Sequence, residues 1–81
     1  MRKYSGLKRV LANSGMEEIK LTISDIEIAI GDKLPESAHS HEAWWGNDKT
    51  HVQARAWMTA GYRVVDIAEP LHSGTATFSR L

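Results

Sequence analysis

The chain has 81 residues, and its ten Lys and Arg residues balance its ten Asp and Glu residues, so the formal net charge at pH 7 is zero. This length predicts one domain, residues 1–81, with a small core. The absence of cysteine excludes disulfides and thiolate metal ligands, and it favours a cytoplasmic location. No segment has the composition of a signal peptide or a membrane span.

The first half of the chain predicts two helices separated by a strand. Residues 3–14 carry apolar side chains at helical spacing, and Gly15 is placed to end that helix. Residues 18–22 alternate polar and apolar side chains, as a half-buried strand does. A second helix is expected to start at Ser24, which would form a capping box with Glu27, and to close at Gly31.

The second half predicts two further helices and a hairpin. Pro35 suits the first turn of a short helix that runs through His41. Asn47 or Asp48 is expected to cap a third main helix, which runs to about Ala60 and ends at Gly61. Residues 62–67 and 75–79 are rich in strand-forming side chains, and the turn-forming residues 69–74 between them complete a hairpin.

These elements predict an α+β fold with a three-stranded antiparallel sheet and a winged-helix-like order: helix, strand, helix, short helix, helix, two-stranded hairpin. In a winged helix-turn-helix the third main helix is the recognition helix, and the hairpin is the wing. The connection from Gly31 to Asp48 is much longer than the turn of a strict helix-turn-helix, so a generic α+β domain is the alternative. The core is expected to contain Leu7, Val10, Leu11, Ile19, Leu21, Ile26, Ala29, Ile30, Trp44, Val52, Ala56, Trp57, Val64 and Phe78.

Residues 41–57 hold all three tryptophans and several side chains that can read hydrogen-bond partners. Trp44 and Trp57 are expected in the core, with Trp45 partly exposed as a ring on which a base can stack. The simpler interpretation is that the tryptophans only build the core.

The helix predicted after Asn47 offers a recognition face. His51 and Arg55 lie four residues apart on one side of it, and Gln53 lies beside Trp57. In a major groove Arg reads guanine and Gln reads adenine. From Lys49 to Val65 the chain has no acid, and its charged residues are Lys49, Arg55 and Arg63. The simpler interpretation is an amphipathic helix with a solvated polar face.

Metal binding and catalysis have little support in the sequence. His39, His41 and His51 lack a fourth ligand and the spacing of a zinc site. No phosphate-binding glycine loop, paired carboxylates or convincing catalytic triad is present. We therefore predict no metal, no cofactor and no catalytic residue.

Two sequence motifs and a tryptophan block point to a family. The motifs are Leu21-Thr22-x-x-x-Ile26-Glu27-x-x-x-Gly31 and Ala60-Gly61-Tyr62-Arg63-Val64, and the block is Ala43-Trp44-Trp45-Gly46-Asn47-Asp48-Lys49-Thr50-His51-x-Gln53-Ala54-x-Ala56-Trp57. Over nearly its whole length the chain resembles a family of small bacterial and archaeal domains of unknown function. The resemblance implies a complete, free-standing member and no particular reaction.

The resemblance also bears on the ligand. Some family members look like accessory modules of restriction or other defence systems, which implies a nucleic-acid or nucleotide ligand. Ser40-His41-Glu42 stands where relatives tend to be more basic, which implies weak binding to a phosphate backbone.

The leading hypothesis is a non-enzymatic nucleic-acid-binding module of a mobile element or of a defence or anti-defence system. Its expected binding residues are Trp45, Lys49, His51, Gln53, Arg55, Arg63 and Arg80. Two alternatives stay open: a nucleotide or cyclic-nucleotide binding protein that acts as a sensor or sponge, and a protein-interaction or inhibitor module built on Trp and Arg hot spots. No membrane partner is expected, and a homodimer through exposed sheet edges stays open.

Overall fold

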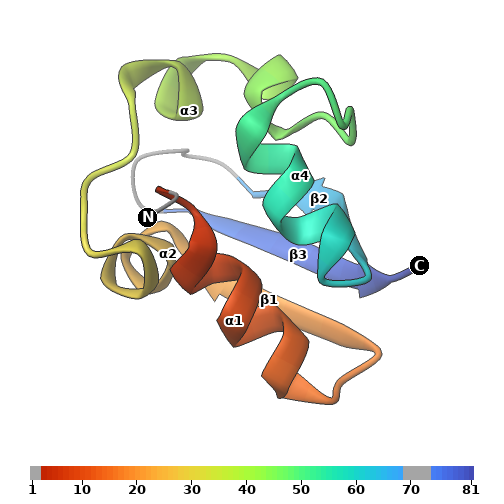
Figure 1. The fold of residues 1–81 in the computed structure, drawn as a ribbon. Coiled ribbons are helices and arrows are strands. Elements are labelled where there is room, and N and C mark those ends of the chain that lie inside the picture. Colours follow the sequence, from red (N-terminus) through yellow and green to blue (C-terminus); the bar gives the residue numbers. More distant parts are fainter. Residues whose placement is uncertain (1–2, 69–73) are drawn as a thin grey trace.

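Helices cover one face of a three-stranded sheet and leave the other face open (Figure 1). The computed structural model describes residues 3–68 and 74–81. The elements, in chain order, are α1 (Ser5–Ser14), β1 (Glu18–Thr22), α2 (Ile23–Ile30), α3 (Glu36–Ser40), the 3-10 helix η1 (Glu42–Trp45), α4 (Val52–Thr59), β2 (Tyr62–Ile67) and β3 (Thr75–Arg80). None of the helices in these ranges has the length and hydrophobicity needed to cross a membrane.

The sheet has the order β1-β3-β2, and both of its strand pairs are antiparallel. Phe78 on the central strand lies between Ile19 of β1 and Val64 of β2, and it is fully buried beneath the helices. The register of β2 shifts between Val64 and Asp66, so one extra residue forms a bulge there. The predicted α+β class, sheet and order of elements are therefore confirmed.

The helices pack around α1, which contacts both α2 and α4, while α4 also packs on β2. Leu7 and Leu11 are the buried residues of α1, at the spacing of one helix face. Gly6 lies on the α2 side, where an added Cβ would overlap the carbonyl oxygen of Ala29. Since α1 separates α2 from α4 and a long connection joins them, these two helices do not form a strict helix-turn-helix (Figure 1).

The start of α2 differs from its predicted start. Thr22 is the N-cap: its hydroxyl accepts from the Asp25 N–H, and the Asp25 carboxylate accepts from the Thr22 N–H. The capping box predicted for Ser24 and Glu27 is therefore wrong by two residues. The Glu27 carboxylate instead accepts from the Leu34 N–H and holds the chain after Gly31 close to α2. Gly31 ends the helix in the left-handed conformation, as predicted.

The predicted cap of α4 is also wrong. The helix starts at Val52, its N-cap is His51, and no side chain caps it. Asp48 accepts hydrogen bonds from the N–H and the hydroxyl of Thr50, which closes a turn ahead of the helix. The turn predicted for residues 69–74 falls largely outside the described residues, which resume at Gly74.

Six of the predicted core residues are buried: Leu7, Leu11, Ile26, Ala56, Trp57 and Phe78. Most of the others are half-buried against it. Val10 and Val52 are wrong, since their exposed fractions are 39% and 54%. Each is next in sequence to a buried residue, but its side chain lies on the part of the helix surface that faces away from the core. Among the described residues, the buried hydrophobic ones that the sequence did not predict are Tyr4, Ile23, Leu34, Ala38, Trp45, Ala54, Tyr62 and Ala76.

Candidate functional site

The tryptophans form one aromatic cluster that joins α1, η1, α4 and β3. The ring centroids of Trp44 and Trp45 lie 4.7 Å apart, and the rings of Trp45 and Trp57 stack at 6.1 Å. Tyr4 meets the edge of Trp44 at 6.0 Å, and Phe78 meets Trp57 at 5.7 Å. Edge-to-face and stacked pairs add to the stabilisation that burial provides. The tryptophan block is therefore mainly the core of the fold.

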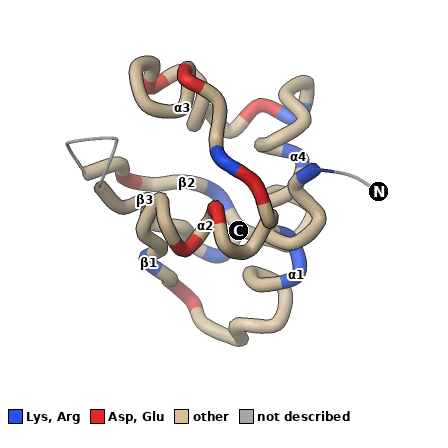
Figure 2. The backbone as a smooth tube through the Cα atoms, turned by 90° about the vertical axis from the view of Figure 1, so that its left-hand side faces the viewer, with Lys and Arg blue, Asp and Glu red and all other residues tan. Residues whose placement is uncertain are grey.

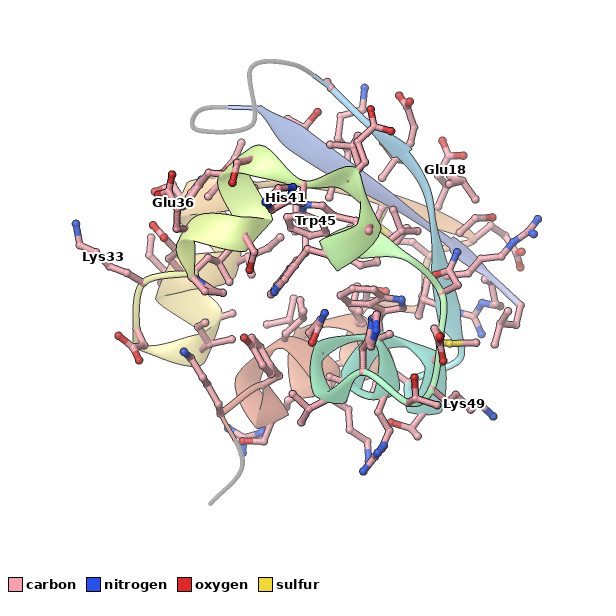
Figure 3. The ribbon with its side chains drawn as sticks, turned by 90° about the horizontal axis from the view of Figure 1, so that it is seen from above. Glu18, Lys33, Glu36, His41, Trp45 and Lys49 are labelled. Atoms are coloured by element: carbon pink, nitrogen blue, oxygen red, sulfur yellow. The ribbon has the colours of Figure 1, made fainter. Side chains whose placement is uncertain are left out.

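Trp45 is not an exposed stacking ring, so that expectation is wrong. Its exposed fraction is 3%, and its indole N–H donates to the Ala38 carbonyl at 3.0 Å. Trp45 lies inside the molecule beneath η1 (Figure 3). The half-buried ring is its neighbour, Trp44. The sequence predicts that Trp44 is buried and Trp45 is partly exposed, and the structure shows the reverse.

Gln53 is not on the exposed face of α4 either. Its side chain is 8% exposed, and its amide nitrogen donates to the Trp44 carbonyl oxygen at 3.0 Å. A side chain that is buried and bonded to the backbone cannot reach a base edge. Gln53 therefore holds η1 against α4. The expectation that its side chain contacts a base is wrong.

Asn47 has a structural role that the sequence did not reveal. Its side-chain oxygen accepts from the indole N–H of Trp57 at 2.9 Å and from the Val64 N–H at 2.8 Å. Its amide nitrogen donates to the Val64 carbonyl at 2.8 Å. One side chain thus satisfies a buried indole and two backbone groups on the outer edge of β2. An edge strand occupied in this way is less available for pairing with another chain.

Two hollows flank Val52 at the start of α4. The first, here called the α1–α4 groove, has a volume of about 200 Å³ and is lined by Tyr4, Ser5, Lys8, Val52, Arg55, Ala56 and Thr59. The second, here called the Trp44 hollow, has a volume of about 470 Å³ and is lined by Ser37, His41, Ala43, Trp44, His51, Val52 and Gln53. Val52 lines both hollows, so they adjoin at the start of α4, and together they are here called the concave surface.

The two helices that border this surface, α1 and α4, carry basic residues and no acid. Residues 2–16 include Arg2, Lys3, Lys8 and Arg9 and no acid, and residues 49–65 are also free of acid. The fold packs α1 from the first stretch against α4 from the second. Basic segments lie on α1 and α4, and acidic ones lie on α2 (Figure 2). Lys8 and Arg55 line the α1–α4 groove, whereas Lys3 and Arg9 line a separate hollow between α1 and α2. The sequence analysis identified the acid-free stretch 49–65. A search for segments without Asp or Glu would also have found residues 2–16.

The expected cations divide into two groups. Lys49, His51 and Arg55 are all exposed and lie together around the first turn of α4, where the Arg55 guanidinium donates to the Lys49 carbonyl at 3.3 Å. Arg63 pairs with Ser79 in the sheet register, two strands from Glu18 in the same row. Arg63 lines neither hollow, so it is not part of the concave surface.

Arg80 belongs to a different structure at the end of the sheet. Its guanidinium donates to the Tyr62 hydroxyl at 3.3 Å, lies over the Tyr62 ring at 5.5 Å and faces Glu17 at 3.9 Å. These contacts tie β3 to the loop after α1. Since an acid and an aromatic ring already engage it, Arg80 is a poor candidate for binding a phosphate.

Two ionisable groups beside the concave surface have altered pKa values. Burial, reinforced by the negative charge of Asp32, raises the pKa of Tyr4 above its ordinary value of 10.0. Hydrogen bonds from the Thr50 backbone and hydroxyl, with the nearby His51, lower the pKa of Asp48. Asp48 therefore keeps its charge in mildly acid solution and holds the turn ahead of α4.

Replacing Tyr4 with Phe should change how stability depends on alkaline pH. A tyrosine whose pKa is raised on folding contributes stability below its unfolded pKa, and this contribution is lost as the pH rises through the folded value. Between about pH 9 and pH 11 the unfolding free energy of the wild type should fall more steeply than that of Tyr4→Phe. Urea unfolding at a series of pH values measures both slopes, and equal slopes would contradict this account.

The described residues contain no cluster of three or more His, Cys, Asp or Glu that could hold a metal ion. The residues that line the concave surface include the cations Lys8 and Arg55, the imidazoles of His41 and His51, and the aromatic rings of Tyr4 and Trp44. These groups bind anions and flat rings.

Comparisons with known proteins identify a family. A family model described as a domain of unknown function, DUF7662, matches residues 4–78. No curated protein and no solved structure matches the chain.

Proposed function

The chain belongs to the DUF7662 family, whose description names no activity, and we propose that it is a non-enzymatic module that binds nucleic acid through α1 and α4. One observation carries the proposal: the two acid-free stretches of the sequence lie against each other in the fold. A chain with no net charge thereby presents a cationic side, and such a side attracts a phosphate backbone. The proposal includes a cytoplasmic location and a mobile-element or defence setting.

The α1–α4 groove supplies the contacts. Lys8 from α1 and Arg55 from α4 line it and are exposed, and the Ser5 and Thr59 side chains add hydroxyl groups. Lys49 extends the cationic rim at the turn ahead of α4. Lys3 contributes less, because Asp32 lies 3.9 Å from its ammonium group. About four phosphate contacts correspond to a slope of roughly −3.6 in log affinity against log salt for duplex DNA.

Charge reversal in the groove tests the proposal. Lys8→Glu combined with Arg55→Glu should lower affinity for DNA at low salt by at least about tenfold and reduce the salt slope by about 2, because two phosphate contacts are lost. Fluorescence anisotropy of labelled duplex and single-stranded DNA measures both quantities. The variant should unfold like the wild type, since both side chains are exposed.

The matched control changes net charge equally at a distance from the groove. Lys20 on β1 and Lys33 after α2 are exposed, and neither lines the concave surface. Lys20→Glu combined with Lys33→Glu should weaken binding by no more than about twofold to threefold through long-range charge alone. Equal losses in the two double variants, or no binding by the wild type at low salt, would overturn the proposal.

A further inference from the structure

We propose that the nucleic acid on this surface is single-stranded, with an unpaired base in the Trp44 hollow and its phosphates in the α1–α4 groove. This inference rests on the proposed function. It adds the form of the nucleic acid and the position of a base.

Trp44 is the tryptophan that a base can reach. Trp45 and Trp57 have exposed fractions of 3% and 0%, and their indole N–H groups donate to Ala38 and Asn47. Trp44 is half-buried and lines the hollow, and within the described ranges its indole N–H donates to no protein acceptor. A ring of this kind, held in place by its neighbours, is a platform for stacking an unpaired base of any sequence.

The rim of the Trp44 hollow is suited to the edge of a base. His41 precedes η1, His51 is the N-cap of α4, and Ser37 comes from α3, so three elements contribute hydrogen-bonding side chains. Imidazole and hydroxyl groups both donate and accept, which matches the mixed edge of a nucleobase. The hollow has a volume of about 470 Å³ and is open rather than enclosed, so it can take one face and one edge of a base.

Val52 connects the base site to the phosphate site. It borders both hollows and is 54% exposed, and Arg55 follows it by three residues on the same face of α4. A strand whose base enters the Trp44 hollow would pass its sugar over Val52 and place its phosphate near Arg55 and Lys8. An exposed apolar residue between an aromatic hollow and a cationic groove fits a sugar placed between a base and a phosphate.

A duplex fits this surface less well. The side chain of Gln53 points inward, so the exposed face of α4 keeps Val52, Arg55 and Thr59, and only Arg55 is a strong reader of base edges. α4 has eight residues and is about 12 Å long. A base within a duplex would have to leave its stack to enter a concave hollow, which costs energy that an unpaired base does not spend.

The test compares oligothymidine of about 12 nucleotides with a duplex of the same length and with thymidine monophosphate, all at low salt. The single strand should bind at least about tenfold more tightly than the duplex and should quench tryptophan fluorescence. Trp44→Leu should lower the single-strand affinity about fivefold or more, remove most of the quenching and leave duplex affinity within about twofold.

A second variant tests the base site without removing a residue of the aromatic cluster, in case Trp44→Leu destabilises that cluster. Ala43 is exposed and lines the hollow, so Ala43→Glu places a carboxylate beside the base site. It should weaken single-strand binding, whereas Ala68→Glu, the same change at an exposed residue after β2, should not.

Equal affinity for single strand and duplex, with no dependence on Trp44 or Ala43, would overturn this inference and leave the proposed function standing. Monophosphate binding as tight as that of the oligonucleotide would also overturn it, in favour of a free-nucleotide site. Absence of binding to every nucleic acid would overturn the proposed function itself.

Discussion

Gly6→Ala is expected to destabilise the protein by about 3 kcal/mol or more, although the same change inside an exposed helix normally stabilises by about 1 kcal/mol. Gly6 lies where α1 crosses α2. An alanine Cβ would overlap the Ala29 carbonyl oxygen and lie 2.8 Å from its carbonyl carbon, and these are backbone atoms that no side-chain rotation can move. The two helices must separate, which opens the core beside Leu7.

Thermal or urea unfolding followed by circular dichroism measures this loss. A domain of this size is stabilised by roughly 4 to 12 kcal/mol, so the variant should lose about a quarter or more of its unfolding free energy. Gly46→Ala is the control, because Gly46 has an ordinary φ of −65° and an added Cβ would lie 3.2 Å from its nearest neighbour, the Ala43 carbonyl oxygen. Its change should stay within about 1 kcal/mol. A Gly6→Ala protein as stable as the wild type would show that α1 and α2 pack differently.

Asn47→Ala is expected to cost about 2 to 4 kcal/mol, although Asn47 lies at the surface. The change leaves the buried indole N–H of Trp57 and the N–H and carbonyl groups of Val64 without their partner. It therefore loosens both the aromatic cluster and the outer edge of β2. Asn13→Ala is the matched control, because Asn13 is exposed on α1, and its effect should be within about 0.5 kcal/mol.

Asn47→Asp distinguishes the role of the side-chain oxygen, which accepts hydrogen bonds, from that of the amide nitrogen, which donates one. A carboxylate still accepts from Trp57 and from the Val64 N–H, but it faces the Val64 carbonyl without a proton to donate. The variant should be less stable than the wild type by about 2 kcal/mol at pH 7 and should recover part of this loss near pH 4, where the protonated acid can donate. Urea titrations at the two pH values test this, and a loss that does not depend on pH would contradict it.

The sequence was sufficient for the elements and their order because these depend on local signals. Gly15, Gly31 and Gly61 all have positive φ at the ends of helices, and β1 follows the predicted alternation. A bulge interrupts the alternation in β2, and three consecutive residues of β3 are buried. The sequence could not identify the N-cap of α2. Thr22 with Asp25 and Ser24 with Glu27 have the same spacing, and only one of the two pairs can start the helix. Packing against the sheet, which buries Ile23, decides between them.

The candidate site depends on contacts that the sequence does not specify. Which of two adjacent tryptophans faces inward depends on the rotation of η1, and the Gln53 bond to the Trp44 carbonyl and the Trp45 bond to Ala38 fix that rotation. Lys49, His51 and Arg55 lie close together, as the sequence predicts, because they belong to one turn and the helix that follows it. The concave surface itself could not be predicted, since it exists only where α1 meets α4.

The position of β3 in the sheet sets when the protein can fold during its synthesis. β3 comes last of the three strands in the chain, yet it is the central one, and β1 and β2 pair only with it. Until residues 75–80 have left the ribosome, the two earlier strands have no ladder partner and Trp57 has no Phe78 to pack against. The tryptophan block therefore lacks its packing partner on the sheet, and stays within reach of chaperones, until Phe78 has left the ribosome.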